Sequence, residues 1–448
     1  MFELPEGLPR RHFLGGAAAG LLFAGSSTGV RAQPASPQDE SFSFFRDPLL
    51  NFNSLFAAGA SGLAAAFGEV AVSVDQARAG GASLQSWYDA SMAMGGKLTR
   101  AAEQSLARGH RVSARARFLR AASFFDQALF FVLGSSTPGA EKDVYLTMDR
   151  AWSQACLLSS PVYEEVAIPY ESRTLPGWFL KPPGSGGRRP TLIVNNGSDA
   201  QNVDTYVYGG AAALERGWNA LLFEGPGQGS MLFVDEIPFR PDWERVITPI
   251  VDFLLGRPDV DSRRIALSGW SLGGGLVARA AAFEPRLAAV VIDPGFVSAF
   301  DGYPAQLREI AKAGDEATVN KIWSQDVVAG ANAAERFNLL KRLEIYSREA
   351  LLESRAGQVP SNWYQLSRTI QKFNVRDVAG KISMPALVLD YAQDNFVLGQ
   401  AADLVALMPP GTPLVTLGPD TGSQYHCAPM NPQWRNEVVF DWLEKTLS

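Results

Sequence analysis

Apolar residues recur at spacings of three and four from about Phe44 to Ser159, and this spacing predicts helices with no convincing strand. In residues 112–133 one face of the predicted helix collects Phe118, Ala122, Phe125, Leu129 and Val132, and Gly109 separates this helix from the one before. The other clear helical stretches are 84–108 and 141–158. We expect these packing helices to form an N-terminal helical domain over residues 44–159.

The pattern changes at Val162, where apolar and polar residues alternate as far as Ile168. Short apolar runs, typical of buried strands, then alternate with helical stretches, which predicts an α/β domain with a mostly parallel, doubly wound sheet. The later strands are predicted at 177–180, 191–194, 220–223, 265–267, 288–292, 386–389 and 414–417. The helices among them are predicted at 205–216, 243–255, 272–283, 398–407 and 433–447.

An insertion at residues 296–378 separates the two parts of this α/β domain, 160–295 and 379–448. The insertion is rich in charged helix formers, for example at 306–312 and 334–349. Its place between consecutive strands favours a helical cap over the substrate site, because loops at strand ends commonly carry binding residues. A surface extension without substrate contact is the alternative.

Residues 1–32 resemble a twin-arginine signal peptide. Arg10 and Arg11 precede a small, apolar stretch at 15–25, and Ala32 ends a sequence that suits signal peptidase. A membrane anchor is the alternative, but an apolar run of about 13 residues is shorter than the ~20 that span a bilayer. We therefore expect the protein to be periplasmic or secreted. It would be exported already folded and would have no stable membrane anchor.

Composition narrows the choice of partners. The 448 residues carry a net charge of −6, and no block of Lys or Arg recurs, which argues against nucleic acid and favours a small-molecule substrate. Cys156 and Cys427 are the only cysteines, so a single disulfide is the most the chain can form. Neither an HxxxH motif nor a cysteine cluster offers a zinc site, and we expect no metal and no organic cofactor.

Gly269-Trp270-Ser271-Leu272-Gly273 is the motif that carries chemistry. It lies between a predicted buried strand and a predicted helix, where a tight turn would expose the Ser271 hydroxyl as a nucleophile. Chance is the alternative, since Gly-x-Ser-x-Gly arises readily in a chain with 42 glycines. The remaining members of a catalytic site decide between the two interpretations.

A serine nucleophile needs a base, and the base needs a carboxylate that orients it. Of the three histidines, His12 lies in the predicted signal peptide, His110 lies at a junction between predicted helices, and His426 follows the last predicted strand. We expect His426 to be the base. Asp394, in the turn beyond the strand at 386–389, is the preferred acid; Asp390, at the end of that strand, is the alternative.

An oxyanion formed on the substrate needs two backbone N–H donors. Leu272 follows the nucleophile and would supply the first. The second is expected from residues 195–199, which directly follow the strand at 191–194, and Ser198 is the best single candidate. Taken alone, these residues would be an ordinary Asn-Gly turn.

With these elements in order, the chain resembles the α/β-hydrolase superfamily. More narrowly it resembles the group of 2,6-dihydroxypseudooxynicotine hydrolase, the yellowish-green-type polyketide-shortening hydrolases and FrsA-like proteins. The resemblance covers nearly all of the chain after residue 32. It is carried by Ala114 to Ala128 (ARARFLRAASFFDQA), Asn196 to Asp199 (NGSD), Glu224 to Gly229 (EGPGQG) and Gly269 to Gly274 (GWSLGG).

The resemblance implies a Ser-His-Asp site under an N-terminal helical cap, and either ester hydrolysis or cleavage of a carbon-carbon bond beside a ketone. The chain departs from the group at Asn196-Gly197, where Gly-Gly is frequent, and at Ser230, where an acidic residue is frequent. Some members use an extra carboxylate near the cap; Asp301 is the accessory candidate, and a solvated loop Asp is the alternative. Dimers are common in the group, so a homodimer is compatible with the resemblance.

The sequence therefore predicts an exported serine hydrolase that forms an acyl-enzyme on Ser271. Trp270, Phe296, Tyr303 and Tyr425 lie near the motifs and favour an aromatic or apolar carbonyl substrate, although aromatics also fill cores. An exported peptidase of the prolyl-oligopeptidase kind is one alternative, but the helical N-terminal region has the wrong period for a β-propeller. A non-catalytic binding protein on a hydrolase scaffold is the other.

Overall fold

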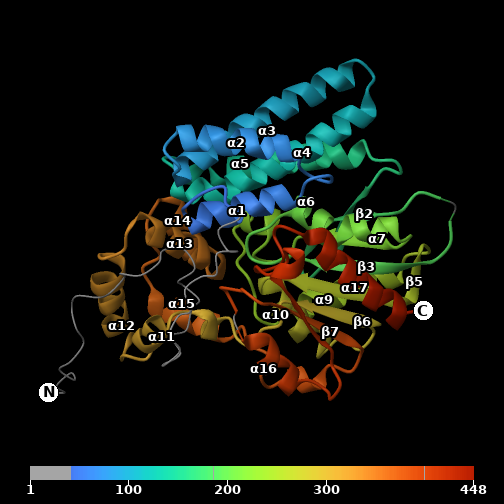
Figure 1. Ribbon diagram of the computed structural model, residues 1–448. Coiled ribbons are helices and arrows are strands. Elements are labelled where there is room, and N and C mark those ends of the chain that lie inside the picture. The colour runs from blue at the N-terminus through green and yellow to red at the C-terminus, as the bar shows by residue number, and fades with distance from the viewer. Residues whose placement is uncertain (1–41, 185, 398) are drawn as a thin grey trace.

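A computed structural model describes residues 42–184, 186–397 and 399–448, and its centre is an eight-stranded sheet (Figure 1). The strand order is β1-β2-β4-β3-β5-β6-β7-β8. The pairs β1/β2 and β2/β4 are antiparallel and the rest are parallel, which confirms the predicted mostly parallel sheet. The strands are β1 (Glu164–Tyr170), β2 (Arg173–Leu180), β3 (Arg189–Asn195), β4 (Asn219–Phe223), β5 (Val260–Trp270), β6 (Ala289–Asp293), β7 (Ala386–Tyr391) and β8 (Leu414–Leu417).

Helices that follow the strands along the chain cover the sheet. They are α6 (Asn202–Thr205), α7 (Ala211–Glu215), α8 (Gly229–Phe233), α9 (Glu244–Leu255), α10 (Leu272–Ala281), α16 (Gln400–Leu407) and α17 (Pro432–Thr446). The helix predicted at 205–216 is interrupted by a wide π-type turn at Tyr206–Gly210, where Gly209 adopts a φ of +158°. This turn places the ring of Tyr208 on that of Trp270, with centroids 4.4 Å apart and nearly parallel planes.

The helices α1 (Pro48–Gly59), α2 (Phe67–Ala79), α3 (Leu84–Ala107), α4 (Arg111–Phe131) and α5 (Glu141–Leu157) precede the first strand. The sequence predicted one apolar face for α4, yet every residue from Phe124 to Phe131 is buried. The reason is that α3 and α5 pack along α4, while Phe337 of the insertion stacks on Phe131 with centroids 5.6 Å apart. The second half of α4 therefore lies inside the protein.

Between β6 and β7 the insertion forms α11 (Ala305–Ile310), α12 (Glu316–Ile322), α13 (Ala333–Leu343), α14 (Arg348–Arg355) and α15 (Trp363–Gln371). The helical stretch predicted at 334–349 is divided, because α13 ends at Leu343 and α14 begins anew, with the Ser347 hydroxyl accepting from Ala350 N. Trp323 and Trp363 are fully buried and stacked at 4.9 Å. The insertion thus has a small core of its own.

A buried charge pair connects the insertion to the N-terminal helices. Arg355 of α14 donates to Glu141 of α5 at 2.9 Å, and the side chain of Glu141 is fully buried. Within the insertion, the buried Lys341 of α13 contacts Glu344 at 2.7 Å. Because an unpaired charge at such a position is strongly unfavourable, the Arg355–Glu141 pair holds the two helical parts against each other.

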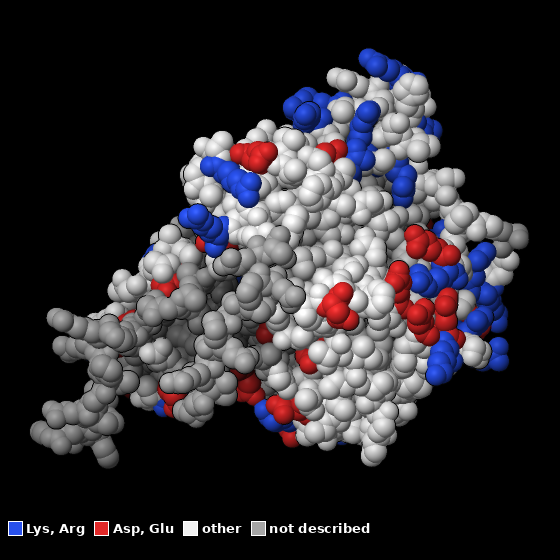
Figure 2. Space-filling view, in the orientation of Figure 1, with Lys and Arg blue, Asp and Glu red and all other residues white. Residues whose placement is uncertain are grey.

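The outer surface carries charges of both signs. Figure 2 shows Lys and Arg at the projecting ends of the N-terminal helices, and mixed basic and acidic side chains near the beginning of β5. No helix among the described residues has the length and apolarity needed to cross a membrane. The predicted signal peptide at 1–32 lies outside the described residues. Cys156 and Cys427 are both buried and free, so they do not form the disulfide that the sequence allowed.

Candidate active site

The turn between β5 and α10 holds Ser271 in an unusual backbone conformation. Ser271 has a φ of +57° and a ψ of −129°, a strained combination for a residue with a side chain. The two motif glycines are required by close packing. A Cβ atom on Gly269 would lie 2.3 Å from the Gly273 carbonyl oxygen, and one on Gly273 would lie 2.6 Å from the Asn196 oxygen. The turn therefore matches the strand-turn-helix context predicted for a nucleophile.

A chain of hydrogen bonds joins Ser271 to His426 and Asp394. The Ser271 Oγ atom lies 3.0 Å from His426 Nε2, and His426 Nδ1 lies 2.7 Å from Asp394 Oδ2. His426 and Asp394 are 8 % and 1 % exposed. Such an arrangement can move a proton from the hydroxyl to the imidazole while the carboxylate holds the ring in one orientation. The structure thus brings together the three side chains that the sequence singled out.

Asp394 is held as a charged group. Its Oδ1 atom accepts from the backbone N–H groups of Phe396 and Val397 at 2.6 and 3.0 Å. Burial by itself would raise the pKa of Asp394, but the neighbouring His426 and these N–H donors lower it below its usual value. Asp390, the alternative acid, lies on β7, where Thr416 Oγ1 donates to it at 3.4 Å. Asp394 is therefore the carboxylate that orients His426.

The loop after β3 lies beside the nucleophile. Ser198 lines the space around Ser271, and its hydroxyl donates to Asp199 at 2.8 Å, which leaves its backbone N–H as the group that could serve an oxyanion. The Gly197 N–H donates to Asn196 Oδ1 at 2.7 Å. Leu272 begins α10, where backbone N–H groups lack a helical acceptor. The assignment of Leu272 and Ser198 to an oxyanion hole stays a prediction.

Side-chain amides hold this loop in place, and the sequence interpretation missed them. Gln228 donates through Nε2 to Asn196 O at 2.8 Å, and its Oε1 accepts from Gly225 N at 3.0 Å. Asn195 Oδ1 accepts from the indole of the buried Trp243 at 2.7 Å. Gln228 lies in the EGPGQG motif, so the motif itself was the available clue to this contact.

Replacing Gln228 with leucine is expected to lower kcat/KM about 10- to 100-fold, because the loop beside Ser271 would lose its support and leave buried polar groups unpaired. Steady-state kinetics on a p-nitrophenyl ester measure the effect. Gln433→Leu is the matched control, since Gln433 Nε2 donates only weakly, at 3.4 Å, to Gly59 O. Equal activity of Gln228→Leu and wild type would contradict the supporting role.

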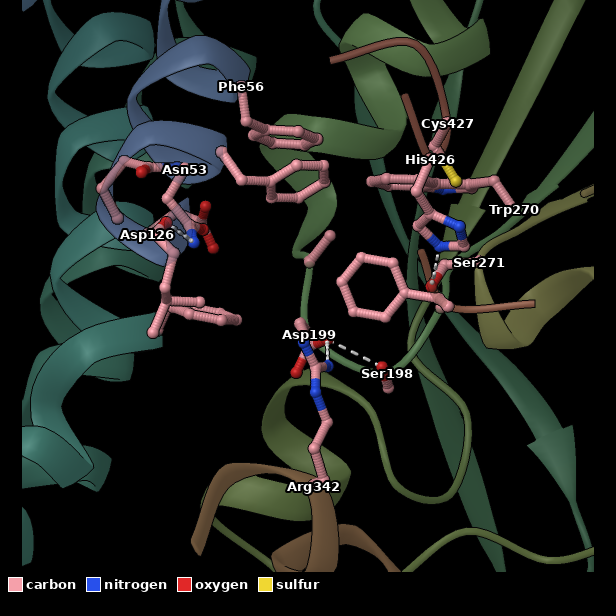
Figure 3. Close-up of a pocket in the computed structure, with 17 residues that line it drawn as sticks. Asn53, Phe56, Asp126, Ser198, Asp199, Trp270, Ser271, Arg342, His426 and Cys427 are labelled. Carbon is pink, nitrogen blue, oxygen red and sulfur yellow. Dashed lines mark hydrogen bonds and ion pairs between the residues drawn. The ribbon is translucent and has the colours of Figure 1, made fainter. Parts of the chain in front are cut away.

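Two pockets meet at Ser271. Both are also lined by Ser198, Arg342, Phe396 and His426. The N-terminal pocket is shown in Figure 3. The rest of its lining is Leu49, Phe52, Asn53, Phe56, Asp126, Gln127, Phe130, Gly197, Asp199, Ala200, Trp270 and Cys427. The insertion pocket is completed by Leu272, Phe296, Ala299, Gly302, Tyr303, Ile345, Tyr346 and Val397. Both helical parts of the chain therefore reach the candidate nucleophile.

Arg342 of the insertion lies where the two pockets meet, and the sequence interpretation did not identify it. Its guanidinium pairs with Asp199 and lies 5.3 Å from the centre of the Phe396 ring. Burial would raise the pKa of Asp199, but Arg342 and Lys341 lower it. The contact fixes the loop after β3 to the insertion.

Two sequence candidates lie elsewhere. Asp301 does not line either pocket; its partly exposed carboxylate pairs with Arg376 at 2.7 Å, so the structure does not bring this accessory candidate to the site. His110 is exposed at the start of α4. Trp270, Phe296 and Tyr303 line the pockets, whereas Tyr425 does not. Within the described ranges no group of three His, Cys, Asp or Glu side chains is arranged to hold a metal ion.

Residues 183–438 match the sequence profile of the alpha/beta hydrolase family. Alpha/beta hydrolase psoB of Aspergillus fumigatus is 35% identical over 230 residues, which are 48% of this chain and 51% of that protein. The 20-hydroxy-prefusarin hydrolase FUS2 of Gibberella moniliformis is 32% identical over 231 residues, 48% of this chain and 54% of that protein. The chain thus spans about half the length of these relatives.

A solved structure is similar over most of the chain. The crystal structure of the 2,6-dihydroxy-pseudo-oxynicotine hydrolase superimposes with a TM-score of 0.63 and 22% sequence identity. The match covers 89% of this chain and 96% of that one. At this identity the likeness establishes a shared fold, including the helical N-terminal region.

Proposed function

Because the chain belongs to the alpha/beta hydrolase family, we propose that it is a serine hydrolase acting on a small carbonyl compound. The observation that carries this proposal is the hydrogen-bonded series Ser271, His426 and Asp394 at the meeting point of two pockets. A serine hydroxyl is a weak nucleophile at neutral pH unless a neighbouring base removes its proton. His426 lies at the distance that this step requires.

In the proposed reaction, Ser271 Oγ attacks the substrate carbonyl as His426 Nε2 takes its proton. The backbone N–H groups of Leu272 and Ser198 stabilise the negative oxygen of the tetrahedral intermediate. When the intermediate collapses, the bond to the leaving group breaks and His426 returns the proton to that group. Water, activated by the same imidazole, then hydrolyses the acyl-Ser271 ester to a carboxylic acid.

Two kinds of bond are compatible with this sequence of steps. With an ester the leaving group is an alkoxide, which His426 protonates to an alcohol. With a ketone that carries a second carbonyl two carbons away, the leaving group is an enolate, and protonation gives a second ketone. The nucleophile, the base and the oxyanion donors are the same in both, so the leaving group alone distinguishes them.

The pockets support an apolar or aromatic substrate. Phe52, Phe56 and Phe130 line the N-terminal pocket, and Phe296 and Tyr303 line the insertion pocket. Aromatic side chains bury large apolar areas of a ligand. A substrate whose carbonyl sits at Ser271 could place its acyl part in one pocket and its leaving group in the other. The relative named a 20-hydroxy-prefusarin hydrolase supports a small-molecule substrate of this kind.

Labelling with a fluorophosphonate tests the nucleophile directly. We expect a covalent adduct on Ser271, mapped by peptide mass spectrometry, and none on the folded protein after Ser271 is changed to alanine. Absence of any adduct on folded protein with His426 intact would refute the proposal. Turnover of a panel of p-nitrophenyl esters and β-diketones then separates the two bond types; hydrolysis of esters alone would exclude carbon-carbon cleavage of those diketones.

A further inference from the structure

Three polar side chains interrupt the aromatic wall of the N-terminal pocket. Asn53 comes from α1, and Asp126 and Gln127 come from the buried half of α4. Figure 3 shows Asn53 and Asp126 across the pocket from Ser271 and His426. We infer that Asp126 and Gln127 form a binding site for a hydroxyl group carried by the substrate at the end remote from its carbonyl.

Both residues carry a buried oxygen that accepts from no N–H or O–H donor among the described residues. Asp126 and Gln127 are 4 % and 3 % exposed, and Asp126 Oδ1 and Gln127 Oε1 have no hydrogen-bond partner among the described residues. A buried polar atom left unpaired costs about 1–3 kcal/mol, so such atoms are uncommon unless a ligand completes them. Two neighbouring residues of this kind in the wall of one pocket point to a ligand with hydrogen-bond donors.

The electrostatic state of Asp126 and Gln127 in the pocket wall favours an uncharged ligand. Burial, and then the neighbouring carboxyl of Asp204, raise the pKa of Asp126 well above its usual value, while Lys341 lowers it only in part. These causes favour the protonated, uncharged form of Asp126, whose carboxyl forms a side-chain hydrogen bond with that of Asp204. In this form the carboxyl of Asp126 offers a carbonyl oxygen, as the amide of Gln127 does. Two neutral acceptors suit a hydroxyl or phenol and repel a carboxylate or phosphate.

A purely structural role explains only part of this arrangement. Asp204 belongs to α6 and its Oδ2 accepts from Gln201 N at 2.8 Å, so the pair with Asp126 fastens α4 to the loop and helix after β3. A hydrogen bond between two carboxyl groups occupies one oxygen of each. It leaves the second oxygen of Asp126 and the side-chain amide of Gln127 without a structural function, and these are the groups that the inferred site uses.

The inference rests on the proposed function only in placing the substrate carbonyl at Ser271. Its test therefore uses binding rather than turnover, in a Ser271→Ala background. The probes are the methyl ketones of benzene, naphthalene and biphenyl, each with and without a hydroxyl at the far end of the ring system. Calorimetry or fluorescence titration gives Kd for each pair, and the three lengths sample the depth of the pocket.

We expect at least one hydroxylated ketone to bind roughly 10-fold more tightly than its parent, as one hydrogen bond to a buried unpaired acceptor allows. Asp126→Leu and Gln127→Leu should each reduce this preference to about 3-fold or less. Asp126→Asn should retain it, because the amide oxygen can accept from the ligand while the NH₂ group donates to Asp204. Asp149→Leu, a change of a partly buried aspartate on α5 outside the pocket, is the matched control.

The preference could fail in two ways, and each overturns the inference. If circular dichroism shows a folded protein and no hydroxylated ketone binds more tightly than its parent, the pocket has no hydroxyl site. A preference that survives in both Asp126→Leu and Gln127→Leu would place the hydroxyl elsewhere. If fluorophosphonate labelling fails while the preference is present, the proposed nucleophile is wrong and the binding site stands.

Discussion

Changing Ser271 to alanine is expected to lower kcat for ester hydrolysis by about 10⁴-fold or more, with little change in the affinity for substrate. The reason is that the Oγ atom forms the bond to the acyl group and has no replacement at the turn. Ser198, the other serine that lines both pockets, directs its hydroxyl to Asp199 rather than to His426. Steady-state kinetics with a p-nitrophenyl ester, together with substrate-analogue binding, measure both quantities.

The control for this change is Ser91→Ala. Ser91 is a fully buried serine of α3 whose hydroxyl has no partner among the described residues, so its loss should alter neither turnover nor folding. Alanine at position 271 should also leave the fold intact, since the side chain is small and its hydrogen bond reaches only the candidate base. A Ser271→Ala protein that retains a tenth of wild-type kcat would show that another group attacks the carbonyl.

Changing Asp394 to asparagine is expected to lower kcat by about 10⁴-fold, with the same change at Asp390 costing less than about 3-fold. An asparagine at position 394 can donate through its NH₂ group to His426 Nδ1, which would favour the tautomer that carries its proton on Nε2. That tautomer cannot accept the Ser271 proton. The Asp394→Asn variant would also lack the negative charge that stabilises the imidazolium of His426 formed during the reaction.

Asp390→Asn is the matched control because both aspartates lie on or just after β7 and only Asp394 contacts His426. Thermal unfolding of both variants separates lost chemistry from lost structure. Removing the charge of Asp394, whose pKa is lowered in the folded protein, should also destabilise the fold, whereas this contribution is absent at Asp390. A larger loss of kcat at Asp390 would overturn the assignment of the acid.

Much of the α/β domain could be predicted from local pattern. The apolar runs that became β3, β5 and β6 are short and uniformly buried, and such runs have few alternatives to a central parallel strand. Ser271, Asp394 and His426 follow the ends of β5, β7 and β8, in that order along the chain. Carboxyl ends of parallel strands lie on one edge of a sheet, so residues 155 positions apart in the chain, Ser271 and His426, come within hydrogen-bonding distance.

The prediction was least complete where packing overrode the local pattern. The stretch at 205–216 has helical periodicity, but the turn at Tyr206–Gly210 breaks it and stacks Tyr208 on Trp270. Residues 112–133 predicted an ordinary helix with one apolar face, and the insertion covers part of what would have been the exposed side of α4. The periodicity of apolar residues shows which side chains will be buried. It does not show which distant segment of the chain packs against them.

The sequence by itself determined the class of sheet, the succession of its strands along the chain and three candidate groups for an acyl-transfer site. It could do so because each depends on residues close together in the chain or on the ends of strands with a known order. Only the tertiary structure decided that Asp126 and Gln127 line the pocket, that Arg342 meets Asp199, and that Asp301 stays outside. Those outcomes depend on how α4 and the insertion pack against the sheet, and packing between segments joins residues whose spacing in the chain predicts nothing about their contact.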